Sequence, residues 1–370
     1  MQRIIEAGSD YSSIEQWIAE KKIATLFLVC DMSLQFLRIK DWIEKLSNRI
    51  KVVKFDDFQP NPLYESVTEG VKLFLENSCD GIMAVGGGSA IDVAKCIKLY
   101  SNMDHSRNYL EQTIVPNTIP FLAMPTTAGT GSEATRYAVI YYNDAKQSVT
   151  HESCIPEAVV FDTSALFTLP LYQKKSTLLD AFCHAVESFW SVNSTEESRS
   201  YSKTAIEMIL QNIDAYLKNE EKAASEMLKA AHIAGKAINI TQTTAGHAMC
   251  YKITSLFHVA HGHAAALCDR VLFAWMVEHP ELCIDQRGPG YLESILLQIA
   301  QAMGETTAAG GAERLKQIFS ELELEVPEAG EEQFELLKTS VNPVRLKNHP
   351  VQLTEETINM LYHKILRVQS

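Results

Sequence analysis

The sequence predicts an α/β domain at the N-terminus followed by an all-helical domain. At 370 residues the chain is long enough for two domains with large cores. Up to about residue 162, short apolar runs alternate with amphipathic stretches, the pattern of a parallel sheet covered by helices. After Leu169-Pro170 the strand signals fade and a helical periodicity takes over. We therefore expect an α/β domain over 1–162 and a helical domain over 163–370.

The individual elements follow from these patterns. The apolar runs that read as strands are 25–31, 51–55, 81–85, 121–125, 137–142 and 158–161. Between the first three runs, SLQFLRIKDWIEKLSNRI and LYESVTEGVKLFLENS have the spacing of amphipathic helices. In the second half, helical spacing extends over 171–190, 198–218, 223–240 and 290–303.

Composition and charge exclude several classes of protein. Hydrophobic residues make up 46% and charged residues 21% of the chain, as in globular proteins. The net charge of −13 and the lack of a basic stripe argue against a nucleic-acid partner, although a local basic pocket could still hold a small anion. No apolar run is long enough to cross a membrane, and the start MQRIIEAGSDYSS does not resemble a signal peptide. We therefore expect a cytoplasmic protein without a membrane partner.

A glycine turn, Gly86 to Gly88, lies between the run at 81–85 and a helical stretch. It lets backbone approach a ligand closely, and the helix start that follows offers N–H groups to a phosphate. A tight structural turn is the alternative, in which Ser89 and Asp92 form a capping box. A second turn, PTTAGTGSEAT at 125–135, suits hydrogen bonds to a sugar or diphosphate, and two such turns on one sheet favour a nucleotide.

Asp31 ends the first apolar run. A carboxylate at this place can accept a hydrogen bond from a ribose hydroxyl and would repel a 2′-phosphate, which favours NAD(H) and leaves use of NADP(H) open. The alternative is an ordinary helix-capping aspartate.

Four residues form a candidate metal site. Asp180 and His184 are four positions apart on a helical pattern, so both side chains leave the same face. Such a pair alone is more often a surface or core pair, but His247 and His261 follow in an apolar segment rich in histidine. One carboxylate and three imidazoles suit a divalent ion such as Fe(II) or Zn(II) and leave room for a substrate oxygen.

GGGSAIDVAK, PTTAGTGSE, DAFCHAVES and GHAMCYKITSLFHVAHG, in this order, resemble the iron-containing (group III) alcohol dehydrogenase family from about residue 20 to about 280. The resemblance implies a Rossmann-like domain, a helical domain, a metal in the cleft between them, and a homodimer. It implies the metal ligands Asp180, His184, His247 and His261. The cofactor contacts that it implies are Asp31, Gly87, Gly88, Ser89, Asp92, Thr126, Thr127, Thr130 and Lys146.

Two further histidines lie in the same segment. His258 is expected to be a loop or core residue. His263, two residues after a ligand, either orients His261 through a hydrogen bond or only packs.

The chemistry that the resemblance implies is reduction of an aldehyde to a primary alcohol, or its reverse. A metal binds the carbonyl oxygen and the nicotinamide delivers hydride. Many members carry a histidine four residues after the third ligand, where this chain has Tyr251. A proton relay through that position is therefore in doubt, and we expect Tyr251 to line a changed substrate pocket.

A basic pocket for an anionic substrate is the second expectation. Lys252 follows Tyr251 and Arg136 follows the second turn, and both could bind a phosphonate or carboxylate. The alternative for Lys252 is a solvated helix end. The segments TRYAVIYY, HESCIPE, ESFWSVNST and HAMCYKIT are similar to the phosphonoacetaldehyde reductase branch of the family, whose members make 2-hydroxyethylphosphonate.

Three other functions are alternatives to reduction of an anionic aldehyde. The first is a reductase or dehydrogenase of uncharged short aldehydes, alcohols or diols, which would hold if Arg136 and Lys252 both faced solvent. The second is a lyase like dehydroquinate synthase, which resembles this fold and also uses NAD with a metal, but whose multi-lysine phosphate site is not evident. The third is a non-catalytic nucleotide-binding protein, which the intact set of four ligands disfavours.

Overall fold

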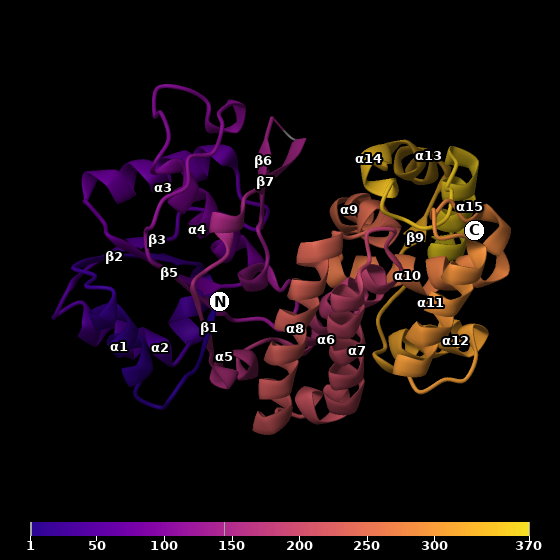
Figure 1. Ribbon diagram of the computed structural model, residues 1–370, viewed down its shortest axis with the longest axis horizontal. Coiled ribbons are helices and arrows are strands. Elements are labelled where there is room, and N and C mark those ends of the chain that lie inside the picture. The colour runs from indigo at the N-terminus through magenta and orange to yellow at the C-terminus, as the bar shows by residue number, and fades with distance from the viewer. Residues whose placement is uncertain (1, 144, 370) are drawn as a thin grey trace. The chain divides into compact units, whose positions relative to one another are not determined.

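A computed structural model describes residues 2–143 and 145–369 (Figure 1). Its contacts divide the chain into two compact units. The first comprises the chain up to Leu169 together with Asn219–Leu228, and the second comprises Pro170–Lys218 and the chain from Lys229 onward. The division after Leu169 lies seven residues beyond the expected boundary at 162, and the first turns of a later helix group with the first unit.

A six-stranded parallel sheet forms the centre of the first unit, in the order β1-β8-β5-β4-β2-β3. Each neighbouring pair runs parallel, as the alternation of strands and helices predicts. The strands are β1 (Arg3–Glu6), β2 (Thr25–Cys30), β3 (Lys51–Phe55), β4 (Gly81–Gly86), β5 (Phe121–Pro125) and β8 (Ala158–Phe161).

Helices cover both faces of this sheet because successive strand residues point to opposite sides. Phe27 and Val29 of β2 join one core with α3 and α4, whereas Leu26 and Leu28 join the other core with α1 and α2. Figure 1 shows α3 on one side of the strands and α1 and α2 on the other. The helices of this unit are α1 (Ser12–Glu20), α2 (Ile39–Leu46), α3 (Tyr64–Glu76), α4 (Gly88–Tyr100) and α5 (Thr163–Phe167).

One expected strand does not belong to the sheet. The run 137–142 forms β6 (Tyr137–Tyr142), which pairs antiparallel with β7 (Ala145–Thr150) in a separate hairpin. The hairpin packs against α4, so Ala138, Ile140 and Val149 are buried without joining the parallel sheet. The sequence-based expectation of a single parallel sheet was therefore wrong for this segment.

The second unit is almost entirely helical, and its two short strands, β9 (Glu328–Ala329) and β10 (Arg367–Val368), pair with each other. The expected helices at 171–190, 198–218, 223–240 and 290–303 are all present, with ends that shift by up to two residues. The helices that follow α5 are α6 (Leu171–Trp190), α7 (Glu196–Leu217), α8 (Glu221–Thr241, whose start groups with the first unit), α9 (Ala245–Phe257), α10 (His261–Glu278), α11 (Pro289–Ala302), α12 (Ala308–Glu321), α13 (Glu331–Ser340), α14 (Pro343–Leu346) and α15 (Glu355–Ile365).

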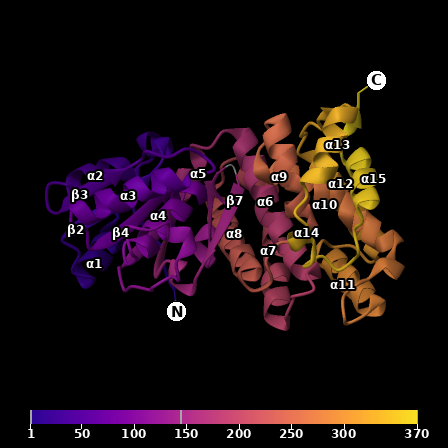
Figure 2. The same ribbon diagram turned by 90° about the horizontal axis from the view of Figure 1, so that it is seen from above.

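Helix α6 is the central helix of this unit. It packs against α7 and α10, and α10 packs in turn against α9, α12 and α15 (Figure 2). Nearly every residue of α6 from Leu178 to Trp190 is buried, including charged ones. Because charged groups are seldom fully buried without a partner, those on α6 are expected to serve a site.

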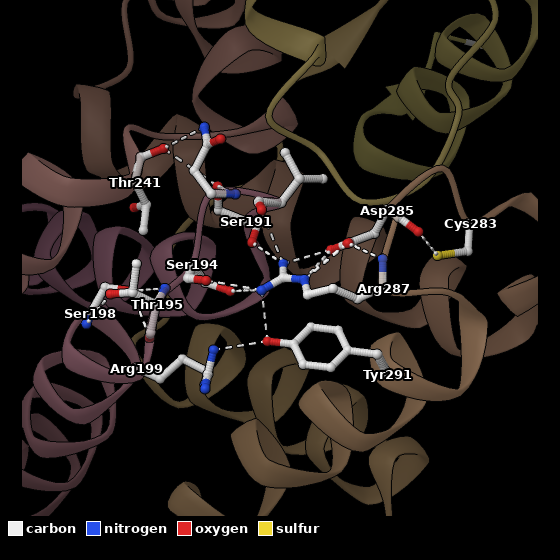
Figure 3. Close-up of polar contacts among 12 residues, drawn as sticks. Ser191, Ser194, Thr195, Ser198, Arg199, Thr241, Cys283, Asp285, Arg287 and Tyr291 are labelled. Atoms are coloured by element: carbon white, nitrogen blue, oxygen red, sulfur yellow. Dashed lines mark hydrogen bonds and ion pairs between the residues drawn. The ribbon is translucent and has the colours of Figure 1, made fainter.

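The end of α6 is held by an arginine from a distant loop. Arg287 donates hydrogen bonds to the backbone carbonyls of Ser191 and Ser194 and pairs with Asp285 at 2.6 Å (Figure 3). A cation at this place satisfies carbonyls that a helix end leaves free. Its guanidinium also lies 4.1 Å from the centre of the Tyr291 ring. These contacts hold the turn at 191–194 that follows α6.

None of the helices in the described part of the chain is long and apolar enough to cross a bilayer.

Candidate metal centre and cofactor turns

Three helices of the second unit bring the predicted metal ligands together. Asp180 lies in the middle of α6, His247 in the first turn of α9, and His261 at the first position of α10. One ligand atom from each of these three residues lies within 4.8 Å of the others. The fourth predicted ligand, His184, lies one turn after Asp180, and its ring stacks on that of His247 with centroids 4.5 Å apart. Three of the four predicted ligands thus come together, and His184 stacks beside them without belonging to that group.

Two glycines beside the ligands allow this approach. A Cβ at Gly262 would overlap the backbone carbonyl of Ser176 and come within 2.6 Å of the Cβ of Asp180. A Cβ at Gly246 would overlap Oδ1 of Asp269 and come within 2.7 Å of Glu187. Only glycine lets the starts of α9 and α10 lie this close to their neighbours.

The charges of the site favour a cation. Burial alone would raise the pKa of Asp180, but His184 and the hydrogen bond with His247 lower that pKa well below its usual range. Burial would lower the pKa of His247, but the carboxylates of Glu187 and Asp180 raise it to about 10. The site thus holds a carboxylate in its ionised form, and it attracts a positive charge that a proton supplies when no metal is bound.

Glu187 is a site residue that the sequence analysis missed. It is fully buried on α6 and accepts hydrogen bonds from the backbone N–H of His247 at 2.9 Å and from its Nδ1. It also accepts from the backbone N–H and, at 2.7 Å, the hydroxyl of Thr244. Because Nδ1–H donates to Glu187, Nε2 is the nitrogen that faces Asp180, 3.4 Å away, and it is the one that can bind a metal once it gives up its proton.

A signal for Glu187 does exist in the sequence. It comes seven residues after Asp180 and three after His184, so helical spacing places all three on one face of an otherwise apolar helix. Asp269 on α10 is also fully buried, and burial followed by the charge of Glu187 raises its pKa well above the usual range.

Tyr251 lies beside the ligands. It is one turn after His247 on α9, and its ring stacks on that of His261 with centroids 5.3 Å apart and an interplanar angle of 22°. Its hydroxyl accepts a hydrogen bond of 2.9 Å from Nη1 of Arg345 on α14, a cation that the sequence analysis did not name. Lys252 is the next residue on α9 and is partly buried.

Arg136 lies in the first unit. Its Nη1 forms an ion pair of 2.6 Å with Glu152, and its guanidinium lies 5.5 Å from the centre of the Tyr137 ring. The hydrogen bonds to Tyr137 and Glu152 raise its pKa. A role of Arg136 and Lys252 in binding substrate stays a prediction.

The two remaining histidines of the segment have different surroundings. His258 is exposed and ends α9 in the left-handed conformation, with φ of 54°. His263 is buried, and its ring nitrogens face the Tyr172 hydroxyl at 3.1 Å and the backbone carbonyl of Glu325 at 2.9 Å. Both nitrogens of His263 are thus engaged away from His261, which favours a packing role.

The two glycine-rich turns of the first unit lie side by side. The backbone N–H of Thr126 donates to the carbonyl of Gly86 at 3.0 Å, and a Cβ at Gly88 would lie 2.9 Å from Thr130. Thr127 faces Gly87 in the same way, at 3.8 Å. The turns that follow β4 and β5 therefore form one surface at the carboxyl ends of neighbouring strands, where ligands of such sheets bind.

The capping box considered for Ser89 and Asp92 is wrong. The N-cap of helix α4 is Gly87, which has no side chain to offer the first N–H groups of the helix. Asp92 instead accepts from the Ser132 hydroxyl at 2.5 Å and from the backbone N–H of Val139 at 2.9 Å. The start of α4 is therefore left open to an anionic group such as a phosphate.

Lys95, also missed by the sequence analysis, holds the second turn in place. Its fully buried Nζ donates to Ser132, Thr135 and the carbonyl of Tyr137 at 3.0, 3.2 and 2.6 Å. Burial lowers the pKa of Lys95 and raises that of Asp92, 3.8 Å away.

Asp31 and Lys146 complete the predicted cofactor residues. Asp31 follows β2 and accepts from the backbone N–H of Ser33 at 2.8 Å, as a helix cap would. It also lines a cavity of about 250 Å³ together with Lys40 and Lys54. Lys146 lies on β7, and its charge lowers the pKa of Asp92 against the larger effect of burial.

Comparison with known proteins identifies the family. The model of the iron-containing alcohol dehydrogenase family matches residues 2–163, and the model of its C-terminal domain matches residues 174–366. The chain belongs to this family. The family and class of enzyme predicted from the sequence are thereby confirmed, as is the fold of an α/β domain followed by a helical domain.

Among curated relatives of the chain, aldehyde-alcohol dehydrogenase 2 of Entamoeba histolytica is 28% identical over 68% of the chain and 31% of its own length. Alcohol dehydrogenase 4 of Saccharomyces cerevisiae is 28% identical over 75% of the chain and 72% of its own length. The chain thus spans about a third of the first relative. Sulfoacetaldehyde reductase from Bifidobacterium kashiwanohense, solved with NAD+, is similar in fold with a TM-score of 0.86 and 22% identity, covering 98% and 96% of the two chains.

Proposed function

We propose that this iron-containing alcohol dehydrogenase family member reduces a small aldehyde to a primary alcohol with NAD(H), and with NADP(H) in second place. The observation that carries the proposal is the convergence of Asp180, His247 and His261, with His184 stacked beside them. One carboxylate and three imidazoles are a donor set that fits Fe(II) or Zn(II), and these four residues would hold the ion. When bound, such an ion supplies a Lewis acid for a carbonyl oxygen.

The residues of the chain prepare this site before any ligand arrives. Glu187 accepts from Nδ1 of His247, so Nε2 is the nitrogen that would coordinate the ion in exchange for its proton. Asp180, whose pKa is lowered by the histidines, offers an anionic oxygen at neutral pH. The ring of Tyr251 stacks on one side of the His261 ring and so helps to fix its orientation.

The cofactor would bind in the first unit. The uncapped start of α4 behind Gly87 suits a diphosphate, and the hydroxyl-rich turn around Thr127 and Thr130 suits further hydrogen bonds to it. Asp31 beside the cavity at the end of β2 suits a ribose hydroxyl and favours NAD(H).

For the substrate we propose phosphonoacetaldehyde, reduced to 2-hydroxyethylphosphonate. The support is the sequence similarity of four segments to phosphonoacetaldehyde reductases and a tyrosine in place of the histidine at position 251. Uncharged short aldehydes or diols are the second candidate, which the ion pair of Arg136 with Glu152 favours. The homodimer and the cytoplasmic location stay predictions.

The test measures loss of NADH absorbance after anaerobic loading with Fe(II) or Zn(II), with phosphonoacetaldehyde, sulfoacetaldehyde and propanal as substrates and NADPH in parallel. Preference for phosphonoacetaldehyde would support the proposal. Equal turnover of propanal would leave an aldehyde reductase and refute the phosphonate substrate. Absence of turnover with metal bound would favour a lyase like dehydroquinate synthase, which consumes no net NADH.

A further inference from the structure

Arg345 lies next to the metal ligands through a single intervening ring. Tyr251 stacks on His261 with a centroid distance of 5.3 Å, and the guanidinium carbon of Arg345 lies 5.1 Å from the centre of the Tyr251 ring. The ring of Tyr251 therefore links the guanidinium of Arg345 to the predicted metal ligand His261. All three residues belong to the helical unit.

The position of Arg345 is set by its helix. The short helix α14 begins at Pro343 after Asn342, whose side chain accepts from the backbone N–H of Val344 at 2.9 Å. The helix packs against α9, which carries both His247 and Tyr251 (Figure 1). The hydrogen bond from Nη1 to the Tyr251 hydroxyl, 2.9 Å long, then holds the guanidinium over α9.

The charge of Arg345 is not neutralised by the protein. Over residues 2–143 and 145–369, no carboxylate lies within ion-pair distance of its guanidinium. By contrast, Arg136 and Arg287 are paired with Glu152 and Asp285. The bond to Tyr251 uses one of five N–H donors, so the others remain for an anionic ligand.

The chemistry of such a ligand follows from the arrangement. A planar guanidinium binds a phosphonate or sulfonate through two parallel hydrogen bonds, which an ammonium cannot do. An aldehyde with one methylene between its carbonyl and such a group is roughly 5 Å long from standard bond lengths. The steps of 5.3 and 5.1 Å set an upper limit to the separation of the His261 ring and the Arg345 guanidinium, and such an aldehyde with a contact at each end can span that gap.

We propose that Arg345 determines substrate specificity by binding the anionic phosphonate or sulfonate group of the aldehyde, with Tyr251 holding the guanidinium in place. This inference rests on the proposed aldehyde reduction and adds the residue that selects a charged substrate. Arg345 would then be the main residue that binds the anionic group, a role that the sequence predicts for Lys252 and Arg136.

The test compares Arg345→Gln, Arg345→Lys and Tyr251→Phe with the wild type. Lys347→Gln is the matched control, because it removes the same charge from an exposed side chain two residues away. For each protein, kcat and KM are measured with phosphonoacetaldehyde, sulfoacetaldehyde and propanal. Calorimetry with 2-hydroxyethylphosphonate and with 2-hydroxyethanesulfonate gives the affinity for each anion without turnover.

Arg345→Gln is expected to raise KM for the charged aldehydes at least about tenfold, as for loss of a hydrogen bond to a charged group, and to weaken binding of the anions to match. KM for propanal should change less than about twofold. Arg345→Lys should lie between, Tyr251→Phe should show a smaller loss of the same kind, and Lys347→Gln should match the wild type. The anion with the larger loss identifies the group that the site prefers.

An equal loss for propanal and for the charged aldehydes would overturn the proposal, because Arg345 would then only support Tyr251. Unchanged binding of both anions in Arg345→Gln, or no binding in the wild type, would also overturn it. A wild type that reduces propanal but binds neither anion leaves the aldehyde reductase intact. If the wild type binds the anions through Arg345 but oxidises no NADH with any aldehyde, the proposed reductase activity is refuted while the anion site at Arg345 is supported.

Discussion

The substitution Glu187→Gln tests how the site is prepared for a metal. Each carboxylate oxygen of Glu187 accepts two hydrogen bonds, one oxygen from His247 and the other from Thr244. An amide has only one oxygen, so its NH2 group must face a pair of donors. The better arrangement turns the NH2 toward Thr244, whose hydroxyl already accepts from Trp190 at 2.8 Å.

The size of the effect follows from these contacts. The backbone N–H of Thr244 would lose its acceptor, and an unsatisfied buried donor costs about 1–3 kcal/mol. His247 would keep a hydrogen bond to a neutral oxygen instead of a carboxylate and become a weaker base. Loss of a partner that orients a metal ligand weakens metal affinity by about 10–100-fold. We expect a loss in this range and a lower Tm.

The assay is competition of the metal-free protein with a chelator for Zn(II), and for Fe(II) under anaerobic conditions. Glu207→Gln on α7 is the control. It also removes a carboxylate, but one whose side chain is exposed and pairs loosely with Lys203, at 3.9 Å. Wild-type metal affinity in Glu187→Gln, with wild-type stability, would refute the idea that Glu187 prepares His247.

Three further predictions concern buried residues. Burial lowers the pKa of His349 from 6.5 to about 4. As pH falls between these values, the unfolded chain takes up a proton before the folded protein does, so the free energy of unfolding drops by about 3 kcal/mol. Urea unfolding measured at several pH values should show a smaller drop in His349→Leu. Gly246→Ala should lower the free energy of unfolding by about 1–3 kcal/mol and weaken metal binding, because the added Cβ would overlap Asp269. Gly290→Ala, where the added Cβ meets open space, should change neither. Tm values from calorimetry test the stability difference between the two variants. Lys95→Met leaves Asp92 buried without its cation and should lower the free energy of unfolding by about 3 kcal/mol or more and weaken NADH binding measured by fluorescence.

Much of the fold could be predicted because its signals are local. The six apolar runs and four long helical stretches were found within about two residues of their ends, since each carries its own periodicity. β6 was assigned to the wrong sheet because its aromatic, apolar run looks like a buried parallel strand. Its partner β7, AKQSVT, has a polar sequence without strand signals of its own. The sequence of one strand alone does not show which other strand it pairs with.

The site was predicted where motif and spacing carry it, as for Asp180 and His184 on one helix turn. Residues that act through distant contacts were missed. Glu187 lies 60 positions from His247, and Arg345 lies 94 positions from Tyr251. Ser89 and Asp92 show the opposite error, because their spacing fits a cap while the fold gives Asp92 a partner 40 residues away in Ser132.

The most direct test of the central claim measures aldehyde-dependent NADH oxidation by the metal-free protein before and after anaerobic addition of Fe(II) or Zn(II), beside His247→Ala and Asp180→Asn. Activity should appear only with bound metal in the wild type and should be lost, together with metal binding, in both variants. Full activity in the metal-free protein, or in a variant that no longer binds metal, would contradict it.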